Sequence, residues 1–172
     1  EGETFGKNGS STGTYKTYAN AKDENDAIRG AVDTAWGIIV GAYTKGGSKD
    51  KWTGVKTSDY TTNTEFDDVW GIITETATNG YSYDKHIGYY TGTYKTESKG
   101  SDINEWGIVE RSVTTSDMVD KWTQRDIGDS YSESKFTDDW GIIYYNHTVT
   151  NTKDKYLGTP TGASASDNAY SI

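Results

Sequence analysis

The phrase Trp-Gly-Ile followed by Ile or Val occurs four times in this 172-residue chain, beginning at Trp36, Trp70, Trp106 and Trp140. An Asp-Lys pair follows each Trp after fourteen residues, beginning at Asp50, Asp84, Asp120 and Asp154. Self-similarity at a nearly fixed period indicates a fold built from copies of one supersecondary unit. Repetition also disfavours an enzyme, because catalysis usually needs one unique constellation of residues.

The composition indicates an ordered protein whose core depends on aromatic rings. Hydrophobic residues make up only 32% of the chain, but aromatic residues make up 13%, with fourteen Tyr and six Trp. Disordered chains are poor in aromatic residues. We therefore expect folded structure in which ring packing supplies much of the buried area.

Charge and residue usage restrict the partners and the location of the protein. A net charge of −9 argues against nucleic acid and anionic membrane surfaces as partners. No apolar run is long enough to span a bilayer as a helix. The chain has no Cys and starts at Glu1, which suggests a removed leader, and its composition is rich in Ser, Thr, Gly, Asn and Tyr. We expect a secreted, extracellular surface protein.

The repeat is most simply a β-hairpin. The segment from each Trp is rich in β-branched and aromatic residues, and it ends near turn formers at 45–48, 79–80, 116–117 and 151–153. Each Asp-Lys pair would begin the returning strand. On this interpretation the Trp-Gly end of the strand is buried, and each glycine leaves room for an aromatic ring. The repeat residues are Trp36-Gly37, Trp70-Gly71, Trp106-Gly107, Trp140-Gly141, Asp50-Lys51, Asp84-Lys85, Asp120-Lys121 and Asp154-Lys155. The rings would come from the second aromatic column, formed by Trp52, His86, Trp122 and Tyr156.

A half-unit at the N-terminus sets the strand count. Residues 12–17 repeat as residues 91–96, inside the returning strand of the second unit. The chain would then have about nine strands, with the last one near 154–161 left over. We predict an all-β antiparallel sandwich or barrel, with a β-solenoid as the alternative and a short helix near 23–32. The single domain divides into a half-unit over 1–35, repeats over 36–69, 70–105, 106–139 and 140–161, and a tail over 162–172.

Few residues suggest chemistry. His86 occupies an aromatic position of the repeat, and nothing near His147 completes a metal or nucleophile pattern. Paired aspartates such as Asp67 and Asp68 could serve glycoside hydrolysis, but adjacent residues of a strand point to opposite faces. We expect no enzymatic activity and no catalytic residues.

Acidic residues before each Trp are the candidates for binding a cation. Hard cations such as calcium prefer carboxylate and carbonyl oxygens, although a solvated acidic turn would look the same in sequence. The candidates are Asp67, Asp68, Asp102, Glu105, Asp138 and Asp139. For the Asp-Lys pairs, local backbone bonding by Asp and edge protection by Lys are the simpler interpretation. Asn8 and Asn146 fit the N-glycosylation pattern.

Two functions remain from the sequence. The first is a structural subunit of a homopolymeric extracellular filament, sheath or surface layer, assembled by donation of the leftover strand. The second is a multivalent carbohydrate-binding module, in which Trp52, Trp122 and Tyr156 stack on sugar rings. A third possibility is a closed barrel that holds a small ligand in its interior.

Overall fold

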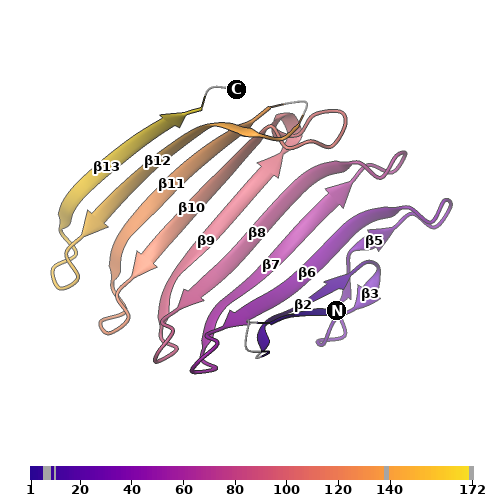
Figure 1. The fold of residues 1–172 in the computed structure, drawn as a ribbon. Coiled ribbons are helices and arrows are strands. Elements are labelled where there is room, and N and C mark those ends of the chain that lie inside the picture. Colours follow the sequence, from indigo (N-terminus) through magenta and orange to yellow (C-terminus); the bar gives the residue numbers. More distant parts are fainter. Residues whose placement is uncertain (6–8, 10, 138–139, 171–172) are drawn as a thin grey trace.

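The computed structural model describes residues 1–5, 9, 11–137 and 140–170, and these form an antiparallel β-sheet protein (Figure 1). The main sheet has eleven strands, ten of which lie in the order β1-β2-β6-β7-β8-β9-β10-β11-β12-β13, while β5 pairs with β6. Their bounds are β1 Gly2–Phe5, β2 Ser11–Tyr18, β5 Ala31–Val32, β6 Ile39–Lys49, β7 Lys56–Phe66, β8 Ile73–Tyr83, β9 Tyr90–Lys99, β10 Arg111–Val119, β11 Asp126–Phe136, β12 Ile143–Lys153 and β13 Pro160–Ala169.

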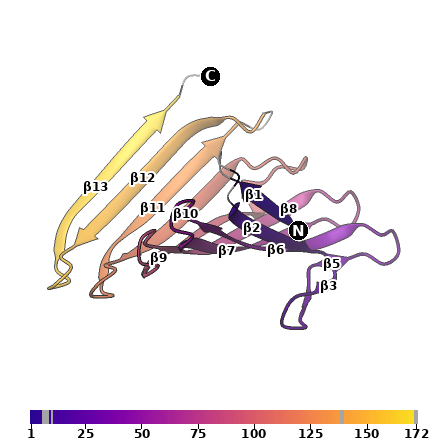
Figure 2. The same cartoon turned by 60° about the horizontal axis from the view of Figure 1, so that its bottom comes forward.

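The all-β antiparallel prediction is confirmed, and the nine long strands β2 and β6 to β13 match the predicted count. The sheet is a meander in which every long strand pairs with its neighbour along the chain. It is open, not closed into a barrel, and antiparallel hairpins replace the stacked coils of the solenoid alternative. Figures 1 and 2 show one twisted layer.

The predicted strand boundaries are wrong by about half a hairpin. Trp-Gly and Asp-Lys do not begin strands. They lie in the loops that join them, so that β6 begins at Ile39 and β7 begins at Lys56. The Trp-Gly loops follow β5, β7, β11 and the β9–η1 segment, and the Asp-Lys loops follow β6, β8, β10 and β12. Strands of eleven residues at about 3.3 Å per residue separate the two loop rows by about 36 Å. The second aromatic column therefore cannot pack on the Trp-Gly glycines.

The predicted turns at 45–48, 79–80, 116–117 and 151–153 lie inside β6, β8, β10 and β12. The glycines that suggested turns have another cause. Gly46 pairs with Tyr60, and Gly80 pairs with Tyr94, across neighbouring strands. A Cβ at Gly46 or Gly80 would overlap the ring of the paired tyrosine. A tyrosine ring occupies the space that a side chain at each of these glycines would need.

The predicted helix near 23–32 is also wrong. Residues 21–32 instead form a small separate sheet of β3 Ala21–Lys22 and β4 Ile28–Arg29, followed by β5. Asp23 accepts backbone N–H bonds from Asn25 at 2.8 Å and Ala27 at 3.0 Å, which stabilises a turn. Ile28 is 66% exposed and does not point into a core. The one helical element among the described residues is the 3-10 turn η1, Gly100–Asp102.

A hydrophobic core is nearly absent from the described residues. The large apolar side chains that are buried are those of Tyr18 and Ile103. The accessible surface is 10873 Å², whereas a compact protein of 19.0 kDa exposes about 8,400 Å². The expected burial of aromatic rings in a core is therefore wrong. No helix in the described part of the chain could cross a membrane.

Candidate interaction surfaces

Each hairpin loop is built around one side chain at its first position. In the loop 50–55, the Asp50 N–H donates to the Val55 carbonyl at 2.8 Å, and the Gly54 N–H donates to the Asp50 carbonyl at 2.9 Å. The Asp50 carboxylate accepts the N–H groups of Trp52 at 3.0 Å and Thr53 at 2.8 Å. These N–H groups lower the pKa of Asp50. Asp therefore bonds the local backbone, as expected, but it does so in a loop.

The loops that contain Trp-Gly have the same hydrogen bonds as the loops that contain Asp-Lys, and the alignment on Trp concealed this equivalence. Asp67 accepts N–H groups from Val69, Trp70 and Gly71, and Gly71 takes a φ of +68°, which favours glycine. The signal in the sequence is Asp followed four residues later by Gly. It recurs every seventeen residues at Asp33, Asp50, Asp67 and Asp84. The structural period is therefore one strand and one loop, half of the apparent unit.

The Trp-Gly edge, defined by the loop residues 33–38, 67–72, 104–108, 137 and 140–142, carries the first row of exposed rings. The side chains that line this edge are 73 to 82% exposed and belong to Trp36, Trp70, Trp106 and Trp140. Successive tips lie two strands apart, or about 10 Å. Neighbouring loops approach each other where the glycine of one loop faces an isoleucine of the loop before it. A Cβ added at Gly71 would lie 3.4 Å from the Ile38 side chain, and one added at Gly107 would lie 2.7 Å from the Ile72 side chain. An open groove of about 550 Å³ lies between Trp70 and Trp106.

The Asp-Lys edge, defined by the loops 50–55, 84–89, 120–125 and 154–159, is cross-linked from loop to loop. Lys121 Nζ lies 2.8 Å from Asp84 Oδ2, and this ion pair lowers the pKa of Asp84 to about 2, with help from the backbone N–H groups of the loop. Thr53 donates to the Lys85 carbonyl at 3.0 Å. The sugar-stacking candidates Trp52, Trp122 and Tyr156 are 62 to 77% exposed on this edge. A lysine lies over each ring: Lys51, Lys121 and Lys155 respectively.

One face of the sheet carries only uncharged side chains in its paired rows. We call it the hydroxyl face. Its central row crosses nine strands as Thr17, Thr44, Thr62, Thr78, Thr96, Thr114, Ser132, Thr148 and Ser166. The next row is Gly2, Tyr15, Gly46, Tyr60, Gly80, Tyr94, Ser116, Ser130, Thr150 and Ser164. The flanking rows continue this pattern with Ser, Thr, Gly, Asn, one Ala and one Met.

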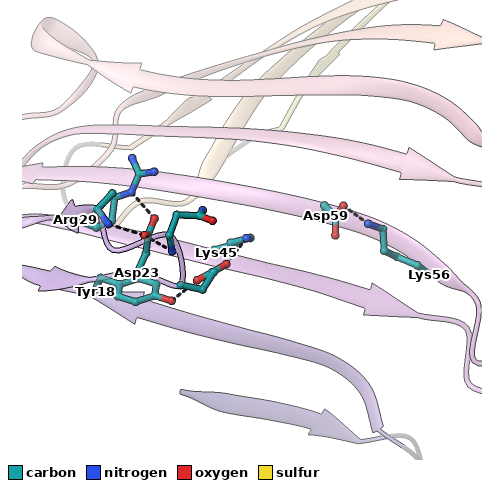
Figure 3. Close-up of polar contacts among 9 residues, drawn as sticks. Tyr18, Asp23, Arg29, Lys45, Lys56 and Asp59 are labelled. Carbon is teal, nitrogen blue, oxygen red and sulfur yellow. Dashed lines mark hydrogen bonds and ion pairs between the residues drawn. The ribbon is translucent and has the colours of Figure 1, made fainter.

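The opposite face, which we call the charged face, carries the ionic residues of the strands. They include Lys45, Asp59, Glu65, Glu75, Lys95, Glu97, Arg111, Asp117, Asp129, Glu133, Lys135 and Asp167. Arg111 bonds both Glu133 at 2.6 Å and Asp102 at 3.1 Å. The β3–β4 segment lies on this face, where Glu24 pairs with Lys45 and accepts the Tyr18 hydroxyl at 2.8 Å (Figure 3). Lys45 is the main cause that lowers the pKa of Glu24 to about 2.

The structure does not gather the predicted calcium ligands. The Asp67 carboxylate accepts backbone N–H groups of its own loop, and Asp102 forms an ion pair with Arg111. Asp68 and Glu105 are exposed in different loops. Asp138 and Asp139 lie outside the described residues. Within the described part, no three acidic or histidine side chains form a group that could hold a metal ion.

The remaining sequence candidates are placed separately. His86 is exposed in its loop, and His147 Nδ1 lies 2.6 Å from Asp167 on the charged face. Asn146 is on the hydroxyl face, where its amide nitrogen donates to Ser134 at 2.9 Å. Asn8 lies outside the described residues.

Comparison with known proteins gives no relative. No family model, no curated protein and no solved structure matches the chain.

Proposed function

We propose that this protein is a secreted, non-catalytic structural subunit that polymerises through the edges of its sheet into an extracellular filament, sheath or surface layer. One observation carries the proposal. In the described part of the chain the sheet ends in β13, a ten-residue strand in which every residue is exposed and only Asp167 is charged. Natural sheets normally block such edges with charges, prolines or bulges, and β13 has its proline and bulge only at its start, at residues 160–162.

The outer main chain of β13 is suited to pairing. The Tyr170 N–H donates to the Tyr144 carbonyl at 2.8 Å. Hydrogen-bonding direction alternates along an antiparallel strand, so the N–H groups of Ala163, Ala165 and Asp167 point away from β12. The small side chains of Ala163 and Ala165 leave room for a neighbouring backbone.

The strand directions favour head-to-tail growth. The path from β1 to β13 contains ten strands that alternate in direction. The β1 strand of a second copy in the same orientation therefore meets β13 in the antiparallel sense, which continues the meander. Donation of β13 would break its nine residue pairs with β12, whereas edge addition keeps them. Edge addition is therefore the form of assembly that we propose.

A proline on the outer side of β13 tests this directly. Ala165→Pro removes an outward N–H and leaves the bonds to β12 in place, while Ala165→Val keeps the N–H and serves as the matched control. We expect growing filaments or ribbons in electron micrographs of the parent and of A165V, and short species for A165P. A parent that remains monomeric in sedimentation at high concentration, with or without calcium, would exclude polymerisation.

A carbohydrate-binding module remains the second candidate, because exposed rings line both loop edges. Flat indole faces stack well on sugar rings, and a row of tips provides avidity. Titration of Trp fluorescence with cello- and chito-oligosaccharides tests it. A response in the parent that is lost in Trp52→Ala/Trp122→Ala would support binding at the Asp-Lys edge, and an unchanged spectrum would count against it.

A further inference from the structure

We infer that the hydroxyl face is a docking surface for a second copy of the same chain, so that two sheets stack into a double layer. This inference goes beyond edge addition and does not depend on it. It starts from the separation of charge between the two faces. Every Lys, Arg, Asp and Glu in the paired rows of β2 and β6 to β12 lies on the charged face.

The hydroxyl face can be covered at little cost, because its polar groups already bond one another. Hydroxyls pair across strands as Thr17 with Thr44 at 2.9 Å, Thr62 with Thr78 at 2.8 Å, Thr96 with Thr114 at 2.9 Å and Ser132 with Thr148 at 3.1 Å. Ser116 and Ser130 form a further pair at 2.7 Å. Burial of a polar group is costly only when the group lacks a partner.

The large rings of the face lie over glycines. Tyr60 lies over Gly46, and Tyr94 lies over Gly80, so each large ring fills the space left by a missing side chain. Elsewhere the rows contain mainly Ser, Thr and Gly, which allow close approach. Rows of small, repeated side chains are the kind that interdigitate in dry contacts between stacked sheets.

The area suffices for a stable dimer. Nine strands about 4.8 Å apart and four rows along each strand cover about 1,100 Å² per copy. Specific interfaces need about 800 Å² per partner. The chain also exposes about 2,500 Å² more than a compact protein of its size. Stacking would supply a buried interior that each sheet lacks alone.

The charged face does not suit this role. Burying its many ions would carry a large desolvation cost. The β3–β4 segment already covers its N-terminal part through Tyr18 and Glu24 (Figure 3).

The test uses matched lysines on the two faces. Thr62→Lys/Thr114→Lys places two charges on the hydroxyl face, and Thr61→Lys/Thr115→Lys places the same charges one residue away on the charged face. Both are made with Ala165→Pro to block the edge. In sedimentation, we expect A165P alone and T61K/T115K to form dimers, and T62K/T114K to raise the dimer Kd by about a hundredfold. Circular dichroism checks that each variant folds.

Two single-cysteine variants give a second measurement, which does not depend on introducing charges that could destabilise the fold. The chain has no Cys, so single thiols report unambiguously. Thr96→Cys lies near the centre of the hydroxyl face, and Lys95→Cys lies beside it on the charged face. A short thiol cross-linker should join T96C copies and leave K95C copies single. A monomeric A165P protein, or equal cross-linking of T96C and K95C, would overturn the double layer, even if the parent still forms edge-to-edge filaments.

Discussion

Lys121 Nζ lies 2.8 Å from Asp84 Oδ2, although the two residues are 37 positions apart and belong to successive loops of the Asp-Lys edge. The pair joins loops that the backbone does not connect directly. Since a single-layer sheet lacks a core to hold its hairpins in place, contacts of this kind fix the spacing along the edge. The same pair makes the edge sensitive to acid.

Acid should loosen this edge over a defined pH range. The pKa of Asp84 falls from 3.8 to about 2 in the folded chain, mainly because of Lys121. A lowered carboxyl pKa adds stability above the unfolded value, and this stability is lost as pH falls from about 4 to about 2. We expect Asp84→Asn to be less stable than the parent at pH 6 and to lose less stability between pH 4 and pH 2. Urea unfolding followed by circular dichroism at each pH measures this, with the exposed Asp68→Asn as the control. Equal pH slopes for D84N and the parent would contradict it.

The first residue of each loop should tolerate Asn but not Ala. Asp67 accepts backbone N–H groups from Val69 at 3.1 Å, Trp70 at 2.5 Å and Gly71 at 2.9 Å. Asn104 has the equivalent role in its own loop, where it accepts the Trp106 and Ile108 N–H groups at 3.0 Å. We expect Asp67→Ala to lower the thermal midpoint clearly and Asp67→Asn to retain most of the stability. Calorimetry measures both, and the idea fails if the two variants melt together below the parent.

The glycines under tyrosine rings should resist a methyl group. In Gly80→Ala the new Cβ forces the Tyr94 ring off the strand, which we expect to cost about 1–2 kcal/mol of unfolding free energy. Gly162→Ala is the control, because its Cβ would approach only the Thr152 hydroxyl, at 3.3 Å. Urea titrations compare the two. In a Tyr94→Ser background the penalty at Gly80 should vanish, and a penalty that persists there would point to another cause.

The tryptophans should contribute little to the stability of the single chain. Trp70 is 79% exposed and Trp106 is 73% exposed. We expect Trp70→Ala and Trp106→Ala each to change the unfolding free energy by less than about 0.5 kcal/mol. Acrylamide should quench most of the Trp emission of the native protein. A loss of several kcal/mol in either variant would mean that the rings are buried in solution.

The sequence predicted the class of fold and the number of long strands because both follow from the repeat itself. The duplicated segments 12–17 and 91–96 placed a returning strand at the N-terminus, and β2 and β9 occupy these positions. The boundaries failed for a physical reason. Trp and Ile usually indicate burial. In a sheet with one layer, however, no second layer covers the rings at the loop tips, and they stay exposed.

The sequence did not reveal the two rows of loops as equivalent, because loops with the same hydrogen bonds have different amino-acid sequences. Asp67 and Asp84 bond their loops in the same way, but one loop contains Trp-Gly and the other contains His-Ile-Gly. Asn79-Gly80 resembled a turn because Gly is common there, and only the cross-strand position of Tyr94 explains it. Charged and uncharged residues alternate along the strands in the sequence, and this alternation separates charge between the two faces. The wrong strand boundaries obscured it.

The pairing of one Trp-Gly loop with one Asp-Lys loop has a consequence for how such a chain can change length. Each 34-residue duplication adds two strands, widens the sheet by about 10 Å and leaves the direction of β13 unchanged relative to β1. Contacts run only between neighbours, as in other repeat proteins. Copy number can therefore vary among descendants of such a gene while the polarity of both outer strands is inherited unaltered.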